Sequence, residues 1–304
     1  MAVATKAIGR WQRERRRAFF WGLAPALAVL GLITIAPAIY LLVTSLTPLN
    51  LTNPAQTALD FSDPLRNYRE ALEDHRFINS VVVQAQLSVA TVVAQILMGL
   101  GIALLLNARS KLLEAIRTAF LIPMVLPPIV VALIWKVIYT PDVSPMHRFL
   151  EMIGLPVRSL ITQADTALWA IAVADTWQWF PFTMLIILAS LQMIPDEPLE
   201  AAKIDGANAM QTFWHVVLPY IRPAIVVAAL FRLIDSVKAF PLIYVLTNGG
   251  PGQVTEVTNY YAFVQAFNFS YWGYASAIAT MLVAGVFFMS WLLGRLDQAS
   301  QRDE

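Results

Sequence analysis

The chain has 304 residues, of which 58% are apolar and only 13% are charged, and its mean hydropathy is +0.61. One soluble core of this size does not normally hold so much apolar surface, so the composition predicts a membrane protein. The formal net charge of +1 conceals an uneven distribution of basic residues, and the absence of cysteine excludes disulfides and thiol chemistry.

Six apolar stretches are long enough to cross a hydrocarbon core, which takes about 20 helical residues. Helices are expected because the stretches are continuous rather than alternating, and every backbone polar group in lipid must be satisfied internally. The sequence therefore predicts an all-α, polytopic membrane bundle of six transmembrane helices. Their expected bounds are 19–47, 81–107, 117–139, 167–193, 220–246 and 274–296.

Lysine and arginine mark the cytoplasmic side of a membrane protein, and they favour one orientation here. With the N-terminus inside, the cytoplasmic segments carry 13 basic residues: Lys6, Arg10, Arg13, Arg15, Arg16, Arg17, Arg109, Lys111, Arg117, Lys203, Arg222, Arg295 and Arg302. The outer segments carry five: Arg66, Arg69, Arg76, Arg148 and Arg158. Both termini are thus expected in the cytoplasm, as a basic segment 1–18 and a tail 297–304 that flank a transmembrane domain 19–296.

The first stretch also has the outline of a secretory leader, since the basic cluster Arg13 to Arg17 precedes an apolar run. A leader has an apolar core of roughly 7 to 15 residues, and this run is about twice as long. The stretch is therefore expected to remain as a membrane span.

The second and third stretches contain features that are unusual in lipid. Gln84, Gln86 and Gln95 lie in the second, where they either form hydrogen bonds between helices or line a polar path. The third contains Ile122-Pro123 and Pro127-Pro128, so its cytoplasmic half cannot be a regular helix. Irregular backbone at that depth must be buried in protein or face a cavity.

The fourth stretch combines polar and aromatic side chains at high density: Asp175, Trp177, Gln178 and Trp179. A sugar ring stacks its C–H faces on aromatic rings and needs donors and acceptors for its hydroxyls, so these residues are candidates for a solute path. An aromatic belt at the membrane surface together with a structural aspartate is an equal alternative.

The fifth stretch carries Arg232, Asp235 and Lys238 at intervals of three. In a helix this spacing makes consecutive members neighbours, so Asp235 can pair with both cations and lower the cost of their burial. Ionisable residues within a membrane suggest function, which makes all three candidates for the path, but a purely structural ion cluster is as good an interpretation.

Several kinds of site are not expected on this chain. There is no G-x-x-x-x-G-K-[ST] phosphate loop for ATP and no recognisable catalytic constellation. His75, His147 and His215 are far apart in sequence and fall on both sides of the membrane in this topology, so no metal site is predicted.

The connection 195–219 between the fourth and fifth stretches is too apolar and too patterned for a flexible linker. Asp196 or Glu197 can cap a helix with Pro198 in its first turn, and Gly206 can end that helix before a second short one begins. Such a helix-turn-helix can press into a groove on a cytoplasmic partner.

The segment EAAKIDGANAMQTFWHVVLP, from Glu200 to Pro219, is similar to the coupling-loop motif of permease subunits of binding-protein-dependent ABC importers. A second match runs from Phe231 through the Thr247-Asn248-Gly249-Gly250-Pro251 turn and resembles the carbohydrate, MalF/UgpA-like branch of that family. The chain departs from the family pattern at Val216, where isoleucine is usual, and at Pro241, where aspartate is common. Its first outer loop is also short.

The resemblance implies a permease domain over 19–296 that forms half of the path for a sugar or sugar-like solute. It implies a second permease subunit, two cytoplasmic ATPase subunits that bind ATP and Mg²⁺, an extracytoplasmic solute-binding protein and a location in the bacterial inner membrane. No cofactor is expected on this chain, and it is not expected to be an enzyme. The alternative is a six-span secondary transporter or channel that acts without an ATPase.

The family motif also implies which residues transmit the ATPase's movement to the membrane. The glutamate supplies a charge for the ATPase groove, and the glycine supplies the turn between the two short helices. The expected coupling residues are Glu200, Ala201, Ala202, Asp205, Gly206, Leu218 and Pro219.

Overall fold

The computed structural model describes residues 2–53, 55–56, 60–108, 110–154 and 158–300, and leaves out the side chains of 2–18, 293 and 296–300. Arg109 and Arg302 of the expected basic segments, and residues 301–304 of the expected tail, lie outside the described residues. Within the described part the chain folds into helices and turns without any strand, which confirms the all-α prediction.

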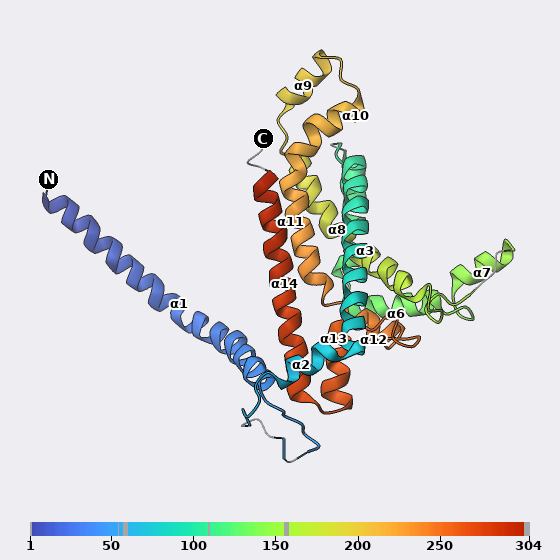
Figure 1. Cartoon of the computed structure of the whole chain (residues 1–304). Helices are drawn as coiled ribbons and strands as arrows, with labels where there is room; N and C mark the ends of the chain where they lie inside the picture. The colour runs from blue at the N-terminus through green and yellow to red at the C-terminus, as the bar shows by residue number, and fades with distance from the viewer. Residues whose placement is uncertain (1, 54, 57–59, 109, 155–157, 301–304) are drawn as a thin grey trace.

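Four long helices run side by side in Figure 1 and form the body of the molecule. They are α3 (His75–Leu105), α8 (Ala167–Leu191), α11 (Leu218–Ser236) and α14 (Trp272–Ser300). The C-terminal end of the first helix, α1 (Ala2–Ser45), contacts α14, and the rest of α1 points away from the body. Its most apolar 18-residue window has 0% of its residues buried.

Five helices are long and apolar enough to span a membrane, and a bent helix pair raises the number to six. The five cover Phe19–Ser45, His75–Leu105, Ala167–Leu191, Ala209–Ser236 and Trp272–Leu292. The bent pair covers Lys111–Val125 and Pro128–Tyr139. The predicted helical membrane bundle is confirmed, and its predicted six spans are reached when the bent pair is counted as one span.

Close packing of α3 against α8 forms the centre of the bundle. A Cβ atom at Gly99 would lie 2.8 Å from the main-chain nitrogen of Met184, so only glycine allows the two backbones to approach this closely. Beside it, the Thr183 hydroxyl donates to the carbonyl of Gln95 at 2.7 Å. A small residue paired with a hydroxyl bond is a common way for helices to associate in lipid.

The third predicted span is broken. It begins earlier than expected, with α4 (Lys111–Phe120), and continues through the short α5 (Ile122–Val125) to α6 (Pro128–Tyr139). The two halves are bent by 95° at the Pro127-Pro128 step. Proline cannot donate to the preceding turn, so two prolines in succession end one helix and start the next.

The fifth predicted span, 220–246, is wrong as a single helix. The helix α11 ends at Ser236, and a separate helix α12 (Phe240–Leu246) follows a turn. Pro241 lacks the N–H that would have bonded to the carbonyl of Val237. That carbonyl instead accepts a 2.6 Å hydrogen bond from the Asn259 amide, so the break leaves it satisfied.

Residues 195–219, called the tip below, protrude at one end of the body in Figure 1. They form α9 (Asp196–Ile204), α10 (Ala209–Thr212) and the π-helical turn η1 (Phe213–Val217), which continues into α11. The opposite end carries α2 (Arg66–Glu73), α13 (Thr258–Phe263) and the π-helical turn η2 (Val264–Asn268), and α7 (Pro145–Met152) projects to the side of the body in Figure 1. The C-terminal end of α14 and the N-terminal end of α1 both lie in the half of the molecule nearer the tip.

Candidate functional site

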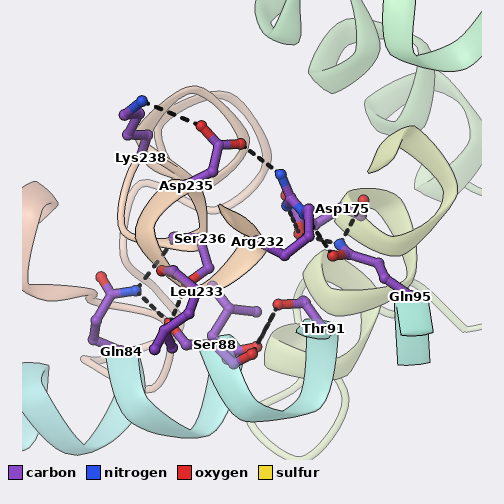
Figure 2. Close-up of polar contacts among 11 residues, drawn as sticks. Gln84, Ser88, Thr91, Gln95, Asp175, Arg232, Leu233, Asp235, Ser236 and Lys238 are labelled. Carbon is purple, nitrogen blue, oxygen red and sulfur yellow. Dashed lines mark hydrogen bonds and ion pairs between the residues drawn. The ribbon is translucent and has the colours of Figure 1, made fainter. Parts of the chain in front are cut away.

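Arg232 on α11 is only 2% exposed, and it contacts side chains of α3 and α8 as well as of its own helix (Figure 2). Its Nε donates to Oε1 of Gln95 on α3 at 2.7 Å, and its Nη1 donates to Asp235 at 2.5 Å. Its Nη2 lies 3.5 Å from Oδ2 of Asp175 on α8. The guanidinium also lies over the ring of Trp179, 4.6 Å from the ring centre.

Two further contacts complete this group, which we call the ion cluster: Arg232, Asp175, Asp235, Lys238 and Gln95. Asp235 pairs with Lys238 at 3.3 Å, and the Gln95 amide donates to Asp175 at 2.9 Å. The cluster holds two carboxylates and two cations, so its formal charges balance. Removing one member of a buried pair leaves an uncompensated charge and typically costs about 3–5 kcal/mol.

Asp235 contacts both cations, as the spacing of three predicts. Lys238, however, lies two residues beyond the end of α11 rather than within a helix. The turn brings the main-chain nitrogen of Lys238 to within 2.8 Å of the Asp235 carbonyl, which keeps the two side chains together.

The three glutamines of α3 lie in two different environments. Gln84 and Gln95 are buried and donate to neighbouring helices: Gln84 to the Ser236 carbonyl of α11 at 3.4 Å, and Gln95 to Asp175 of α8 at 2.9 Å. Gln86 is exposed on the free face of α3. Inter-helix bonding is therefore the observed role of the two buried glutamines.

A cavity of about 240 Å³ lies next to the ion cluster. Five of the seven predicted path residues line it, together with residues from both helix breaks. The lining residues are Pro128, Asp175, Gln178, Trp179, Asp235, Lys238, Ala239, Pro241 and Leu242. Small-molecule pockets usually measure about 300–1,000 Å³, so this chain supplies space for a small solute or for part of a larger one.

The other two predicted path residues do not line the cavity. Arg232 is not among the lining residues, because it is buried and bonded within the ion cluster. Trp177 packs edge-to-face against Trp135 of α6, with 5.9 Å between ring centres, in the apolar core around α3, α6 and α8. The two predicted tryptophans of α8 therefore have different surroundings: Trp179 contacts the ion cluster, and Trp177 packs into the apolar core.

Gln178 connects the cavity to the break between α5 and α6. Its Nε2 donates at 3.3 Å to the carbonyl of Leu126, which lies in the break between the two helices. Its Oε1 is buried and has no hydrogen-bond partner in the described part of the chain. The whole residue is 1% exposed, so this oxygen is enclosed by protein atoms rather than open to the cavity.

The contributions of Pro128, Pro241, Ala239 and Leu242 to the cavity were not predicted. The two prolines are recognisable in the sequence as helix breakers, and the breaks bring their neighbours to the same wall. Ala239 and Leu242 carry no local signal, because their position depends on how α12 packs against α6 and α8.

Local backbone chemistry shapes the tip. After α9, Gly206 adopts a φ of +77°, its N–H bonds to the Lys203 carbonyl, and the Ala207 N–H bonds to the Ala202 carbonyl. These two bonds form the Schellman motif that ends many helices at a left-handed glycine. The expected break at Gly206 is therefore present.

A capping box starts the next helix of the tip. The Asn208 side chain accepts from the Gln211 N–H at 2.9 Å, and the Gln211 side chain accepts from the Asn208 N–H at 2.8 Å. The expected cap of α9 by Asp196 or Glu197 is absent, since Pro195 occupies the N-cap position and both acids lie in the first turn. Carboxylates in a first turn still favour the helix through its dipole.

The expected coupling residues fall into an exposed and a packed group. Glu200, Ala201, Asp205, Gly206 and Pro219 are exposed, whereas Ala202 is buried and Leu218 packs against the apolar core at this end of the bundle. Three large apolar side chains that were not predicted as coupling residues are also exposed: Ile204 at 86%, Met210 at 66% and Trp214 at 56%. The tip therefore presents both a carboxylate and apolar surface.

At the opposite end, Asp74 caps α3 and joins it to α13 and α14. Its carboxylate accepts from the hydroxyls of Tyr261 and Tyr274 and from the Arg76 N–H. Burial raises the pKa of Asp74, but these hydrogen bonds outweigh it and leave the pKa below its ordinary value. Arg76 in turn forms a two-point ion pair with the buried Glu256, at 2.7 and 2.8 Å.

Residues 95–302 match the family model described as "Binding-protein-dependent transport system inner membrane component". This match covers the tip, the cavity and most of the body of the protein. The chain belongs to this family. Its function class is therefore the one that the coupling-loop motif predicts, a permease subunit rather than an enzyme, and it is a multi-pass membrane protein.

Relatives with curated names support this membership. The chain is 35% identical to "Probable ABC transporter permease protein y4oQ" of Sinorhizobium fredii over 285 residues, which covers 93% of this chain and 91% of the relative. It is 36% identical to "Trehalose/maltose transport system permease protein MalF" of Thermococcus litoralis over 217 residues, covering 71% and 73%.

Among solved structures, a chain of the bacterial alginate ABC transporter, in complex with an alginate pentasaccharide-bound periplasmic protein, has a TM-score of 0.80 to this permease. The match covers 95% of this chain and 97% of the other at 18% identity. At that identity the likeness shows the fold, and the fold is that of an ABC importer permease.

Proposed function

We propose that this permease forms half of the path of an ATP-driven importer for a sugar or sugar-like solute in a bacterial inner membrane. The observation that carries the sugar assignment is the cavity, which is lined by Trp179 together with the charged residues Asp175, Asp235 and Lys238. Flat apolar surface next to hydrogen-bonding groups suits a polyhydroxylated ring. The named solute of the trehalose/maltose relative supports the same class.

The remaining half of the path belongs to a second permease subunit. A solute-binding protein delivers the solute from outside, and two cytoplasmic ATPase subunits hold ATP and Mg²⁺. The exposed face of the tip, with Glu200, Ile204 and Trp214, is the docking surface for an ATPase subunit. This role requires the tip to face the cytoplasm.

The distribution of charge supports that orientation. The ends of α1 and α14 lie in the half of the molecule nearer the tip in Figure 1, and the basic N-terminal segment is part of α1. Basic segments remain on the cytoplasmic side of a membrane. Both termini and the tip are accordingly cytoplasmic in this proposal.

Uptake into liposomes tests the proposal. The permease is purified with its second permease and ATPase subunits, reconstituted, and supplied with radiolabelled sugars and its solute-binding protein. We expect uptake that requires both ATP and the binding protein. Uptake driven by an ion gradient without the ATPase would instead support a secondary transporter and contradict the proposal.

A further inference from the structure

A second cavity, of about 340 Å³, lies where α1 and α14 meet, at the end of the molecule opposite the tip. Its wall includes Pro48 and Leu49, just after the first apolar span ends at Ser45. It also includes Tyr271, just before the last span begins at Trp272. A cavity at the ends of two membrane spans lies at the depth of the lipid headgroups rather than of the hydrocarbon. We call it the outer cavity.

The helix α2, which forms one side of the outer cavity, has the character of a helix at a membrane surface. Leu65 and Leu72 lie on the same side of this helix and are 60% and 63% exposed. Asn67 and Ala71, on another side, are buried against the rest of the protein. A short helix with exposed leucines beside charged residues suits the boundary between headgroups and acyl chains.

Two opposite charges on α2 line the outer cavity. Arg66 and Glu70 are four residues apart, so their side chains share one side of the helix. They form no ion pair within the described part of the chain, and arginine before glutamate is the less favourable order for a direct pair. Their charged neighbours are otherwise engaged: Arg69 pairs with Asp63, and Asp60 accepts a main-chain N–H at 3.0 Å. One cation and one anion are therefore available to a ligand.

The inner wall of the outer cavity is fixed by close contacts between α1, α2 and α14. Asn67 is 6% exposed, and its Nδ2 donates to the carbonyls of Ser45 and Thr47 at 2.9 and 2.8 Å. A Cβ atom at Gly273 would lie 2.1 Å from the Thr47 carbonyl oxygen, so only glycine fits there. The Asn67 Oδ1 receives no hydrogen bond in the described structure and is not fully enclosed. It is therefore a fixed acceptor beside the two charges.

We infer that the outer cavity binds the phosphoethanolamine headgroup of a membrane phospholipid. Arg66 binds the phosphate, and Glu70 and the Asn67 Oδ1 accept hydrogen bonds from the ammonium. A primary ammonium has three N–H donors, whereas the trimethylammonium of a choline headgroup has none. In the orientation proposed above the lipid belongs to the extracytoplasmic leaflet. The inference does not depend on which solute is carried.

Lipid binding to the purified protein tests this inference. The full-length permease is purified with its partner subunits in detergent, and bound lipid is removed. Phosphatidylethanolamine, phosphatidylglycerol and phosphatidylcholine with identical acyl chains are then added separately, and native mass spectrometry measures the bound lipid. We expect one site at which phosphatidylethanolamine binds roughly fivefold more tightly than either of the others. Equal affinity for the three lipids would overturn the inference.

Four variants on α2 locate the site. Arg66→Gln should weaken the binding of phosphatidylethanolamine roughly tenfold, because the phosphate loses its cation. Arg69→Gln is the matched control, since this arginine does not line the cavity. Glu70→Gln should remove the preference for phosphatidylethanolamine over phosphatidylglycerol, and Glu73→Gln is its control. Wild-type binding by Arg66→Gln would contradict the assignment. If that variant does not fold, a preference retained in Glu70→Gln contradicts it independently.

Two further measurements distinguish the source of the headgroup and the kind of ligand. Soluble O-phosphoethanolamine carries the same charges without acyl chains and should bind far more weakly than the lipid. Equal affinity would mean that the ligand is a soluble molecule, and the lipid assignment would be wrong. The affinity of the solute-binding protein for the complex should be the same for Arg66→Gln and wild type. If that affinity falls while lipid binding is unchanged, the outer cavity is a protein contact and the inference fails.

Discussion

The tip and the ion cluster are held together in opposite ways. The tip is one continuous segment, in which Gly206 and the Asn208–Gln211 capping box act over a few residues. The ion cluster joins Gln95, Asp175 and Arg232, which are separated by 80 and 57 positions along the chain. Damage to the tip should therefore remain local, whereas damage to the cluster should affect three helices at once.

The largest effect is expected for Arg232→Ala. It leaves Asp175 buried without its cation and removes the bond to Gln95, so the folded state should lose about 3–5 kcal/mol. Arg232→Lys keeps the charge, but an ammonium group cannot bond to three partners as the planar guanidinium does. The stability of this variant should lie between those of wild type and Arg232→Ala. Thermal unfolding of the detergent-purified complex measures both. Equal stability of alanine and wild type would show that the cluster does not hold the helices together.

The next largest effect is expected for substitutions of Gly206. Its size should depend on whether the new residue tolerates a left-handed backbone conformation. A Cβ atom there meets nothing within 4 Å, so strain arises only from the φ of +77°. Valine in that conformation costs about 1–2 kcal/mol, whereas asparagine adopts it readily. Gly206→Val should reduce both uptake and co-purification of the ATPase, and Gly206→Asn should retain most of each. Equal loss in the two variants would mean that the left-handed turn is not what matters.

Asn208→Ala should have a smaller and strictly local effect. Loss of an N-cap costs about 1 kcal/mol, which corresponds to roughly fivefold more opening of the helix. Hydrogen exchange of residues 209–212 measures this opening, and exchange in α3 and α8 serves as the internal control. Faster exchange in α8 would contradict the view that the tip is stabilised locally.

The smallest effect is expected at Asp74, and it depends on pH. The pKa of Asp74 is lowered in the folded protein, so its contribution to stability is present above the ordinary pKa and is lost as pH falls through the folded value. The melting temperature of wild type should therefore fall more steeply than that of Asp74→Asn below about pH 4. Parallel curves for the two proteins would show that Asp74 is not the titrating group.

The same contrast explains what the sequence could predict. The break at Gly206 and the second short helix follow from residue types over a few positions. Hydrophobic length locates the membrane spans approximately, although it does not show where the third and fifth are broken. The partners of Asp235 were also predictable, because both lie three residues away. Each of these inferences needs only short-range information.

Other features depend on tertiary packing. No local signal in the sequence pairs Gln95 with Arg232, or separates Trp177 from Trp179, because helix packing decides both. Pro241 was identifiable as a departure from the family pattern. Its effect, a break that ends α11 at Ser236 and creates a wall of the cavity, required the structure.

The central claim is that a partner's ATP hydrolysis reaches this permease through the tip. The chain has no cysteine, so a single cysteine can be introduced without a background reaction. Ile204→Cys at the tip and Met152→Cys on α7 have similar exposure in the native residues, 86% and 84%, and form a matched pair. Each purified variant is labelled with a thiol-reactive photo-crosslinker before the ATPase and the other subunits are added. The account predicts a crosslink to the ATPase subunit from position 204 and none from position 152. The opposite pattern, or no ATPase crosslink from position 204 in an active complex, would contradict it.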